Sequence, residues 1–303
     1  AKRILLIANP VSGNRQGEQR LAEAKSHLEA LGHSVSAKLT EAPGHAADLA
    51  GAVATRYGII AALGGDGTVN EVVNGLAKER DGLDQAQLGI LPLGTMNVFA
   101  RELGIPLAAK RAWETIRLGQ ARAVDLPLAR VQTADGQAER CFVQMAGVGL
   151  YANAVGGVSI ALKKKIGPLA YLFSTLAALK AKPPKLTATW DSGSARGEWM
   201  CVGNGKFFGG PVVLFPDAKL NDGRLDLCVF PRVNPGSVSR GVTSMALGQI
   251  GDWPGAVHHR VSELTIDGPA GTRVQADGEF IGTLPITITL RPRALKVIVP
   301  LEK

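Results

Sequence analysis

The stretch of sequence that decides the fold of this chain is LGGDGTVNEVVNG, at residues 63–75. It follows an apolar run at residues 58–63, which is typical of a buried strand in a parallel sheet. After the glycines, Val69, Val72 and Val73 recur at the spacing of one helix face. The sequence therefore predicts a buried strand, a glycine-rich turn and a helix in direct succession.

A turn of this kind suits a phosphate group. The backbone N–H groups and the positive end of the helix dipole converge there, and glycines let a ligand approach the backbone closely. Asp66 adds a carboxylate at the same point, and a carboxylate beside a phosphate needs a cation, for which Mg²⁺ is the usual choice. The alternative is an ordinary tight turn with a solvated Asp66. Walker A is excluded because no Gly-Lys-Ser/Thr follows, and the dinucleotide fingerprint because Asn70 stands at its third glycine position.

Composition sets the class of protein and of partner. The chain has 303 residues, of which 46% are hydrophobic and 20% charged, enough for one large or two ordinary domains with a sizeable core. The net charge of +8 favours acidic partners, namely phosphates, nucleic acid or an anionic membrane. Aromatic residues make up only 5% and do not alternate with basic ones, so we expect no nucleic-acid partner.

The three cysteines, Cys141, Cys201 and Cys228, lie far apart in apolar runs and form no CxxC pair. We therefore expect buried free thiols in a reducing compartment. The first apolar run ends at Asn9-Pro10 and is too short for a signal segment, and no stretch reaches the length of a membrane span. Together these features predict a cytoplasmic protein, with peripheral contact at the inner membrane face as an open alternative.

Strands and helices alternate over residues 3–118. We expect strands at 3–8, 35–39, 58–63 and 88–91, and helices at 45–56, at 98–103, at 108–118 and on a face formed by Leu21, Leu28 and Leu31. Such alternation predicts βαβ units and a parallel, Rossmann-like sheet. Ligands of these sheets bind at the carboxyl ends of the strands, where we expect the loops 9–14, 64–68 and 92–97 to converge.

The pattern changes near residues 124–127. Beyond them short β-type runs dominate, separated by turn signals such as Asn221-Asp222-Gly223 and Asp277-Gly278. The runs lie at 127–133, 140–146, 186–190, 198–203, 224–230, 261–267, 272–276 and 285–290, with helical pieces around 160–181 and 235–248. We expect an α/β domain at 1–124 and a mainly antiparallel β-sandwich at 125–291, with 292–303 as a segment that could rejoin the first domain.

Five motifs, in order along the chain, resemble those of one superfamily. GGDGT at 64–68 is the signature of the diacylglycerol kinase, sphingosine kinase and NAD kinase superfamily. NPVSG at 9–13 resembles its NPxSG loop, and LGTMN at 93–97 resembles its LGTxN segment, with Met96 where related kinases have Ala or Gly. PDAKLNDG at 216–223 is similar to its hairpin motif, and DGE at 277–279 matches its DGE motif. The NPxSG and DGE motifs make the set more similar to bacterial soluble lipid kinases of the diacylglycerol kinase type than to NAD kinases.

The resemblance implies an ATP- and Mg²⁺-dependent transfer of the γ-phosphoryl group to the hydroxyl of a lipid, such as diacylglycerol or phosphatidylglycerol. It assigns Asp66 to the Mg²⁺ on the ATP phosphates and Glu279 to the general base, with Asp277 as a supporting carboxylate. By the same resemblance, ATP is held by Asn9, Thr40, Gly64, Gly65, Asp66, Gly67, Thr68, Val69, Asn70 and Thr95. Without the resemblance, Asp277-Gly278 is simply a good hairpin turn and Glu279 an exposed strand residue.

The resemblance also implies a second, structural Mg²⁺ site. Its ligands are the carboxylate of Asp222 and the main-chain carbonyls of Lys219 and Arg224. Two cationic side chains beside a metal are unusual, although a residue that ligates through its carbonyl can carry any side chain.

No acidic residue occurs between Glu139 and Asp191, and segment 160–185 carries six lysines around an apolar run at 169–179. A basic, apolar helix can lie on an anionic membrane, which suits an enzyme with a lipid substrate. The alternative is a core-packing helix whose lysine ends are solvated. GVGLYA at 147–152 mimics a dinucleotide motif, but the acid expected about 20 residues further on is absent.

Two other functions stay open on the sequence. One is a kinase for a soluble acceptor such as NAD, and the other is a non-catalytic sensor of nucleotide or lipid. The presence of both Asp66 and Glu279 favours an enzyme over a sensor. An acceptor pocket for a lipid is apolar and cannot be identified from one sequence, and neither can the oligomeric state.

Overall fold

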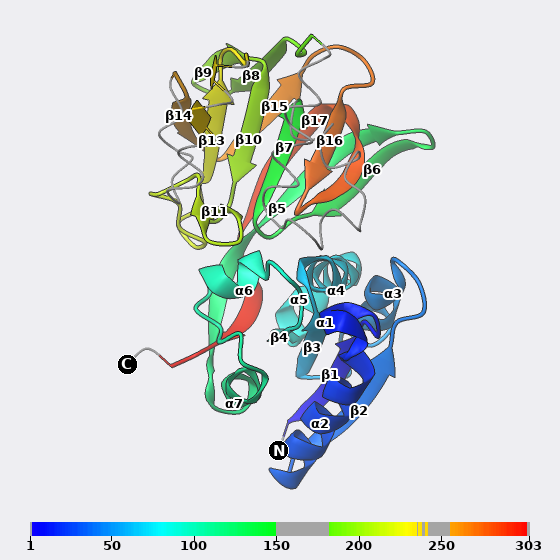
Figure 1. Cartoon of the computed structure of the whole chain (residues 1–303). Coiled ribbons are helices and arrows are strands. Elements are labelled where there is room, and N and C mark those ends of the chain that lie inside the picture. Colours follow the sequence, from blue (N-terminus) through cyan, green and yellow to red (C-terminus); the bar gives the residue numbers. More distant parts are fainter. Residues whose placement is uncertain (1, 150–181, 235, 238–239, 242–254, 302–303) are drawn as a thin grey trace. The chain divides into compact units, whose positions relative to one another are not determined.

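The computed structural model describes residues 2–149, 182–234, 236–237, 240–241 and 255–301 (Figure 1). The helical piece expected at 160–181 and most of the one expected at 235–248 lie outside these residues, as does most of the basic segment 160–185. The chain divides into two compact units, of which the first comprises residues 1–126 with 292–303 and the second residues 127–291. Each unit is described by itself.

The first unit is built on a parallel sheet, as predicted. Its strands run in the order β4-β3-β1-β2, and each pairs in parallel with its neighbour. They are β1 (Arg3–Ala8), β2 (Ser34–Leu39), β3 (Ile59–Gly64) and β4 (Gln87–Pro92). Every residue of β3 is buried, which explains its uninterrupted apolar run.

Helices alternate with these strands. They are α1 (Ser12–Arg15), α2 (Gly17–Ala30), α3 (His45–Gly51), α4 (Asp66–Lys78), α5 (Gly82–Gln85), α6 (Val98–Glu102) and α7 (Ala109–Leu118). Leu21 and Leu28 of α2 are buried against the sheet as expected, but Leu31 is 41% exposed. The reason is that α2 ends at Ala30 and Gly32 turns the chain away with a φ of +83°. Helix α3 is also shorter than the predicted 45–56.

The last strand returns to the first unit. β17 (Glu279–Val299) begins in the second unit, and near its end Val297 pairs in parallel with Leu88 of β4. The buried carboxylate of Asp125, in β5 (Gln120–Thr133), accepts the N–H of Arg293 at 2.7 Å. This bond ties the returning segment to the strand that leaves the first unit.

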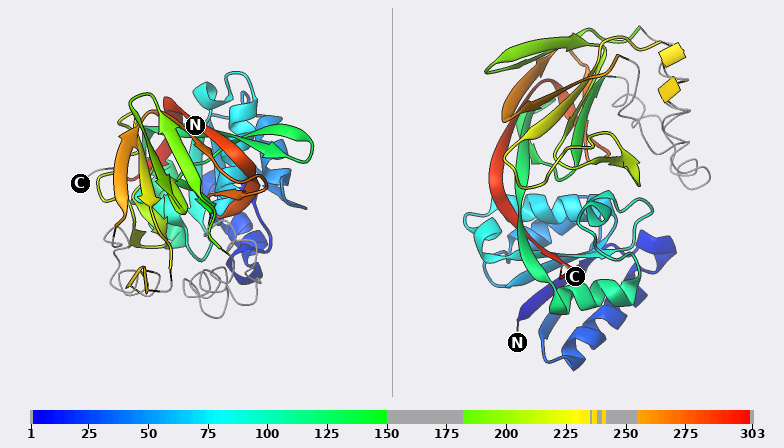
Figure 2. Two further views of the ribbon diagram at one scale, coloured as in Figure 1. Left: turned by 90° about the horizontal axis from the view of Figure 1, so that it is seen from above. Right: turned by 90° about the vertical axis from the view of Figure 1, so that its left-hand side faces the viewer.

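The second unit is an antiparallel β-sandwich, as predicted (Figure 2). Its strands pair in the order β14-β13-β10-β7-β16-β17, while β15 pairs with β17 and β8, and β9 with β8. They are β6 (Gly136–Cys141), β7 (Met145–Gly149), β8 (Leu186–Trp190), β9 (Gly193–Gly197), β10 (Trp199–Gly203), β11 (Phe207–Gly209), β12 (Val212–Val213), β13 (Leu225–Phe230), β14 (Val257–Val261), β15 (Glu263–Asp267) and β16 (Arg273–Ala276). The core contains Val148, Leu227, Ile266 and Ile286, from four different strands.

The three cysteines are free and buried, which confirms the prediction of buried free thiols. Burial raises the pKa of the Cys141 thiol to about 11 and that of the Cys228 thiol to about 12, so both are protonated near neutral pH. Within the described ranges, no helix is long and apolar enough to cross a membrane.

Candidate active site

The GGDGT stretch forms the predicted turn between β3 and α4. β3 ends at Gly64 and α4 begins at Asp66, so the first N–H groups of this helix face the carboxyl end of the strand. A Cβ on Gly64 would lie 2.4 Å from Oγ1 of Thr68, a side chain that is itself buried. Only glycine fits at Gly64, because Thr68 packs directly against its backbone.

Two further loops lie against this turn. Asn9 donates its N–H to the carbonyl of Leu63 at 3.1 Å, and Leu93 donates its N–H to the carbonyl of Gly64 at 2.8 Å. A Cβ on Gly94 would come within 2.5 Å of the Cα of Gly65, so these two backbones touch. The loops 9–14, 64–68 and 92–97 therefore meet at the carboxyl ends of β1, β3 and β4.

Asp66 connects the turn to helix α6. Its carboxylate Oδ1 accepts the N–H of Phe99, in the first turn of α6, at 3.3 Å. The side chain is half-buried at the edge where the backbones of the glycine-rich loops meet. A half-exposed carboxylate beside a glycine-rich turn at the N-terminus of a helix is a donor of the kind with which proteins hold Mg²⁺ on a nucleotide. The residues present thus fit that ion.

The remaining nucleotide candidates fall into two groups. Thr95 is exposed, and Thr40 is half-buried at the end of β2, where its N–H donates to the carbonyl of Ala8 at 2.9 Å. Val69 and Asn70 are buried within α4, and Nδ2 of Asn74 donates to Oδ1 of Asn70 at 3.0 Å. Their side chains therefore support the helix rather than face solvent.

Asn9 shapes its own loop, since its Oδ1 accepts the N–H of Val11 at 3.0 Å. Two supporting residues were missed from the sequence. Asn97 adopts a φ of +47°, and its amide group exchanges two hydrogen bonds with the backbone of Gly94. Glu71 accepts the N–H groups of Gly44 and Ala46 and so holds the start of α3 against α4. The Asn in LGTMN and the Glu three residues after Thr68 were visible as polar residues, but their partners were not.

In the second unit, the DGE motif forms the turn between β16 and β17. Asp277 and Gly278 both have positive φ, which this turn requires. The Asp277 carboxylate accepts three backbone N–H groups, from Val143 at 2.7 Å, Gln144 at 2.9 Å and Met145 at 3.1 Å. Asp277 is thus an anchor that joins the turn to β7.

Glu279 follows the turn as the first residue of β17. Its side chain is 41% exposed, and its Oε2 lies 3.3 Å from Nη2 of Arg140. A carboxylate with this exposure can take a proton from a group that approaches from solvent. Asp66 belongs to the first unit and Glu279 to the second.

The carboxylate of Asp222, proposed for the second metal, already forms an ion pair with an arginine. Oδ1 of Asp222 accepts the N–H of Arg224 at 3.1 Å, and Oδ2 pairs with Nη2 of Arg260. Nε of Arg260 lies 3.7 Å from Oδ1 of Asp226, a carboxyl whose pKa is raised by burial. The described residues contain no group of three or more His, Cys, Asp or Glu that could hold a metal. A site made from one carboxylate and two carbonyls stays a prediction.

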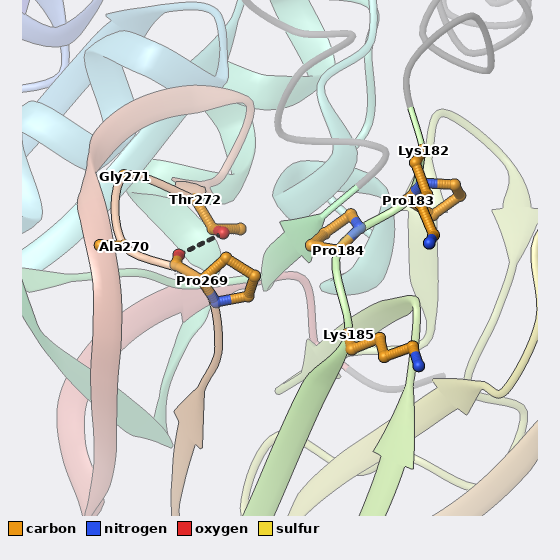
Figure 3. Close-up of a pocket in the computed structure, with 8 residues that line it drawn as sticks. All are labelled: Lys182, Pro183, Pro184, Lys185, Pro269, Ala270, Gly271 and Thr272. Carbon is orange, nitrogen blue, oxygen red and sulfur yellow. Dashed lines mark hydrogen bonds between the residues drawn. The ribbon is translucent and has the colours of Figure 1, made fainter.

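A pocket of about 500 Å³ lies elsewhere in the second unit, between residues 182–185 and 269–272 (Figure 3). Thr272 closes the second of these loops by donating its hydroxyl to the carbonyl of Pro269 at 2.6 Å. The pocket contains none of the predicted site residues. Lys182 and Lys185 in its lining are exposed, and they are the described end of the basic segment 160–185.

Comparison with known proteins identifies two matching families. Residues 3–129 match the diacylglycerol kinase catalytic domain, and residues 145–299 match the YegS C-terminal NAD kinase beta sandwich-like domain. A protein named diacylglycerol kinase from Bacillus subtilis is 32% identical over 308 residues, covering 100% of this chain and 98% of the relative. One of the same name from Staphylococcus aureus is 30% identical over 303 residues, covering 99% and 93%.

Solved structures show the same fold. The crystal structure of a putative diacylglycerol kinase from Bacillus anthracis matches with a TM-score of 0.79 at 25% identity, over 98% of this chain and 97% of that one. Yeast NADH kinase, in complex with NADH, matches with a TM-score of 0.53 at 10% identity, over 99% and 84% of the two chains. At that identity the likeness to the yeast enzyme concerns the fold alone.

The contact between Gly65 and Gly94 leads to a first prediction. In Gly94→Ala, the new Cβ would clash with the Gly65 backbone and with Oδ1 of Asn97. This clash would push the loops 64–68 and 92–97 apart. We expect the Kd of Mg·ATP, measured by calorimetry, to rise about tenfold or more, equivalent to about 1.4 kcal/mol. Gly58→Ala is the control, because a Cβ there meets nothing within 4 Å. ATP affinity equal to that of the unchanged protein would contradict the importance of this contact.

A second prediction concerns the cation proposed at Asp222. Arg260→Gln removes the guanidinium from two carboxylates, so the variant should lose about 1–3 kcal/mol of stability in EDTA. If Asp222 with the carbonyls of Lys219 and Arg224 binds Mg²⁺, the ion should restore the melting temperature of this variant. Adding Asp222→Asn should remove the response. Equal responses of all three proteins to Mg²⁺ would argue against a cation at Asp222.

Proposed function

Because this chain belongs to the family of bacterial diacylglycerol kinases, we propose that it is an ATP- and Mg²⁺-dependent lipid kinase. It would transfer the γ-phosphoryl group of ATP to the hydroxyl of a lipid such as diacylglycerol or phosphatidylglycerol. The observation that carries most weight is the convergence of three loops at the carboxyl ends of β1, β3 and β4, where the backbones of Gly65 and Gly94 touch next to Asp66.

On the nucleotide side, the glycine backbones at 64–67 and the start of α4 would hold the phosphates. Asp66 would ligate Mg²⁺, which when bound neutralises phosphate charge during transfer. Thr68 keeps the turn closed against Gly64, while Asn9, Thr40 and Thr95 border it from the neighbouring loop ends. Val69 and Asn70 would contribute by fixing the position of α4.

On the acceptor side, Glu279 would take the proton of the lipid hydroxyl. The hydroxyl oxygen then bonds to the γ-phosphorus, and the bond between that phosphorus and the bridging oxygen breaks, so that ADP leaves. Asp277 would hold the turn before Glu279 in place, because its carboxylate accepts three backbone N–H groups. None of the residues in the proposed site requires a covalent phospho-enzyme.

A lipid acceptor requires access to a membrane. The net charge of +8 and the exposed Lys182 and Lys185 favour an anionic surface, at about 1 kcal/mol per basic residue close to it. The proposal extends this contact over 160–185. A soluble acceptor such as NAD is the second candidate, and the fold shared with yeast NADH kinase is the reason to test it.

The test is the transfer of labelled γ-phosphate from Mg·ATP to a panel of acceptors. The panel contains diacylglycerol, phosphatidylglycerol and a sphingoid base in mixed micelles, and free NAD. We expect label in one lipid class. Label in NAD alone would replace the lipid acceptor by a soluble one, and ATP binding without transfer to any acceptor would favour a sensor.

The same assay tests the general base. Glu279→Gln keeps the shape of the side chain but cannot accept the proton, so we expect turnover to fall by about 100-fold or more with Mg·ATP binding unchanged. Glu139→Gln is the matched control, because Glu139 is a half-exposed, ion-paired glutamate of the same unit. Turnover that survives Glu279→Gln would show that another group takes the proton.

A further inference from the structure

One set of hydrogen bonds, between Asp277 and residues 143–145, supports the ion pair between Arg140 and Glu279; we call this set the clamp. Arg140 lies in β6, three residues before Val143, and Glu279 lies two residues after Asp277. The Asp277 carboxylate binds the backbone N–H groups of residues 143–145, and the Asp277 N–H donates to the carbonyl of Met145 at 2.9 Å. The same set of bonds therefore fixes the backbone beneath both partners of the pair.

A buried polar network supports this clamp from the other side. Nδ2 of Asn204 donates to the carbonyl of Val143 at 3.0 Å, and its N–H donates to the carbonyl of Gln144 at 2.9 Å. Nε2 of Gln144 donates to the carbonyl of Phe207 at 3.1 Å, and both amide side chains are buried. Segment 143–145 is thus bonded on both sides in a low-dielectric environment, where hydrogen bonds are strong.

This backbone support distinguishes the pair from an ordinary surface ion pair. Exposed pairs contribute little, because two long side chains on independent elements must be ordered at once. Here both backbones are fixed by the clamp, and the Arg140 side chain is only 29% exposed. Pairing therefore costs less conformational entropy than it does in an exposed pair, and the Arg140 guanidinium can hold the Glu279 carboxylate in one orientation.

A neighbouring pair shows what the clamp adds. Arg130 and Glu139 face one another across β5 and β6, with Nη2 and Oε1 2.6 Å apart, and both are about half exposed. Glu139 precedes Arg140 in β6, so the two side chains point to opposite faces of the strand. The Arg130–Glu139 pair has the same chemistry on the same hairpin, but it makes no contact with the DGE turn among the interactions described.

We propose that Arg140 is a positioning residue that orients the Glu279 carboxylate for proton transfer; this rests on the function proposed above. A general base works only if its oxygen meets the hydroxyl in line with the phosphorus, and an error of about 1 Å can cost 10²-fold in rate. Arg140 counters the charge of Glu279 before the transfer. When the hydroxyl proton moves to Glu279, the carboxyl group becomes neutral and Arg140 keeps its own proton.

The test compares Arg140→Gln, Arg140→Lys and the control Arg130→Gln in the lipid kinase assay. We expect Arg140→Gln to lower kcat by about 10- to 100-fold while the KM for ATP and the melting temperature match those of Arg130→Gln. Arg140→Lys should recover part of kcat, because it restores the charge without the fork of donors. Methylguanidinium added to Arg140→Ala should recover part of kcat as well, which a purely structural defect would not allow.

Three results would overturn the inference. An unchanged kcat in Arg140→Gln, with Glu279→Gln inactive, would remove the role of Arg140 and leave the proposed function intact. An equal loss of kcat in Arg130→Gln would show that the hairpin, rather than Arg140, is responsible. Failure of the unchanged protein to phosphorylate any lipid would remove the proposed function, and the role of Arg140 with it.

Discussion

The close approach of two glycine backbones is the constraint on which the first unit depends. Gly65 and Gly94 belong to loops that leave neighbouring parallel strands, and the space between their backbones does not admit a methyl group. Parallel strands bring their carboxyl ends to one edge, but side chains on the loops would normally keep the backbones apart. Glycine at both positions allows the two loops to touch at this edge of the sheet.

In the second unit, a half-buried carboxylate, that of Asp277, holds a hairpin turn in place. A hairpin turn at the edge of a sandwich is free to move unless something outside the hairpin holds it. Asp277 holds the turn by accepting three N–H groups from residues 143–145, which lead into β7 and are far away in sequence. A strained turn with positive φ at two positions is thereby fixed, and the residue after it, Glu279, takes a defined place on β17. The first unit thus holds three glycine-rich loops together, and the second unit holds the backbone of Glu279 in place.

Local signals in the sequence predicted most elements of the fold. The buried run before Gly64 and the helical spacing after it identified β3 and α4, and the change of texture near residue 124 identified the antiparallel half. The errors have physical causes. Leu31 looked like part of an apolar face, but α2 ends at Ala30, so Leu31 lies beyond the helix and is exposed. The apolar runs at 285–290 and 295–299 looked like two separate strands, whereas both belong to the single strand β17.

The partners of the site residues could not be predicted. The bonds of Asp277 span more than 130 positions, and the pairing of Arg260 with Asp222 and Asp226 spans more than 30, so no spacing rule applies to them. Arg140 belongs to none of the sequence motifs, so its position beside Glu279 is seen only in the structure. The resemblance to known kinases assigned roles to single positions, whereas the structure shows which positions hold one another.

The most direct test of this account is amide hydrogen exchange with and without Mg·ATP. If the converging loops hold the nucleotide, protection should increase at 9–14, 64–68 and 92–97 and in the first turn of α4. The groove between α2 and β2, lined by Leu21 and Leu39, should not respond. Protection confined to that groove, or absent from all three loops while ATP is bound, would contradict the central claim that these loops form the nucleotide site.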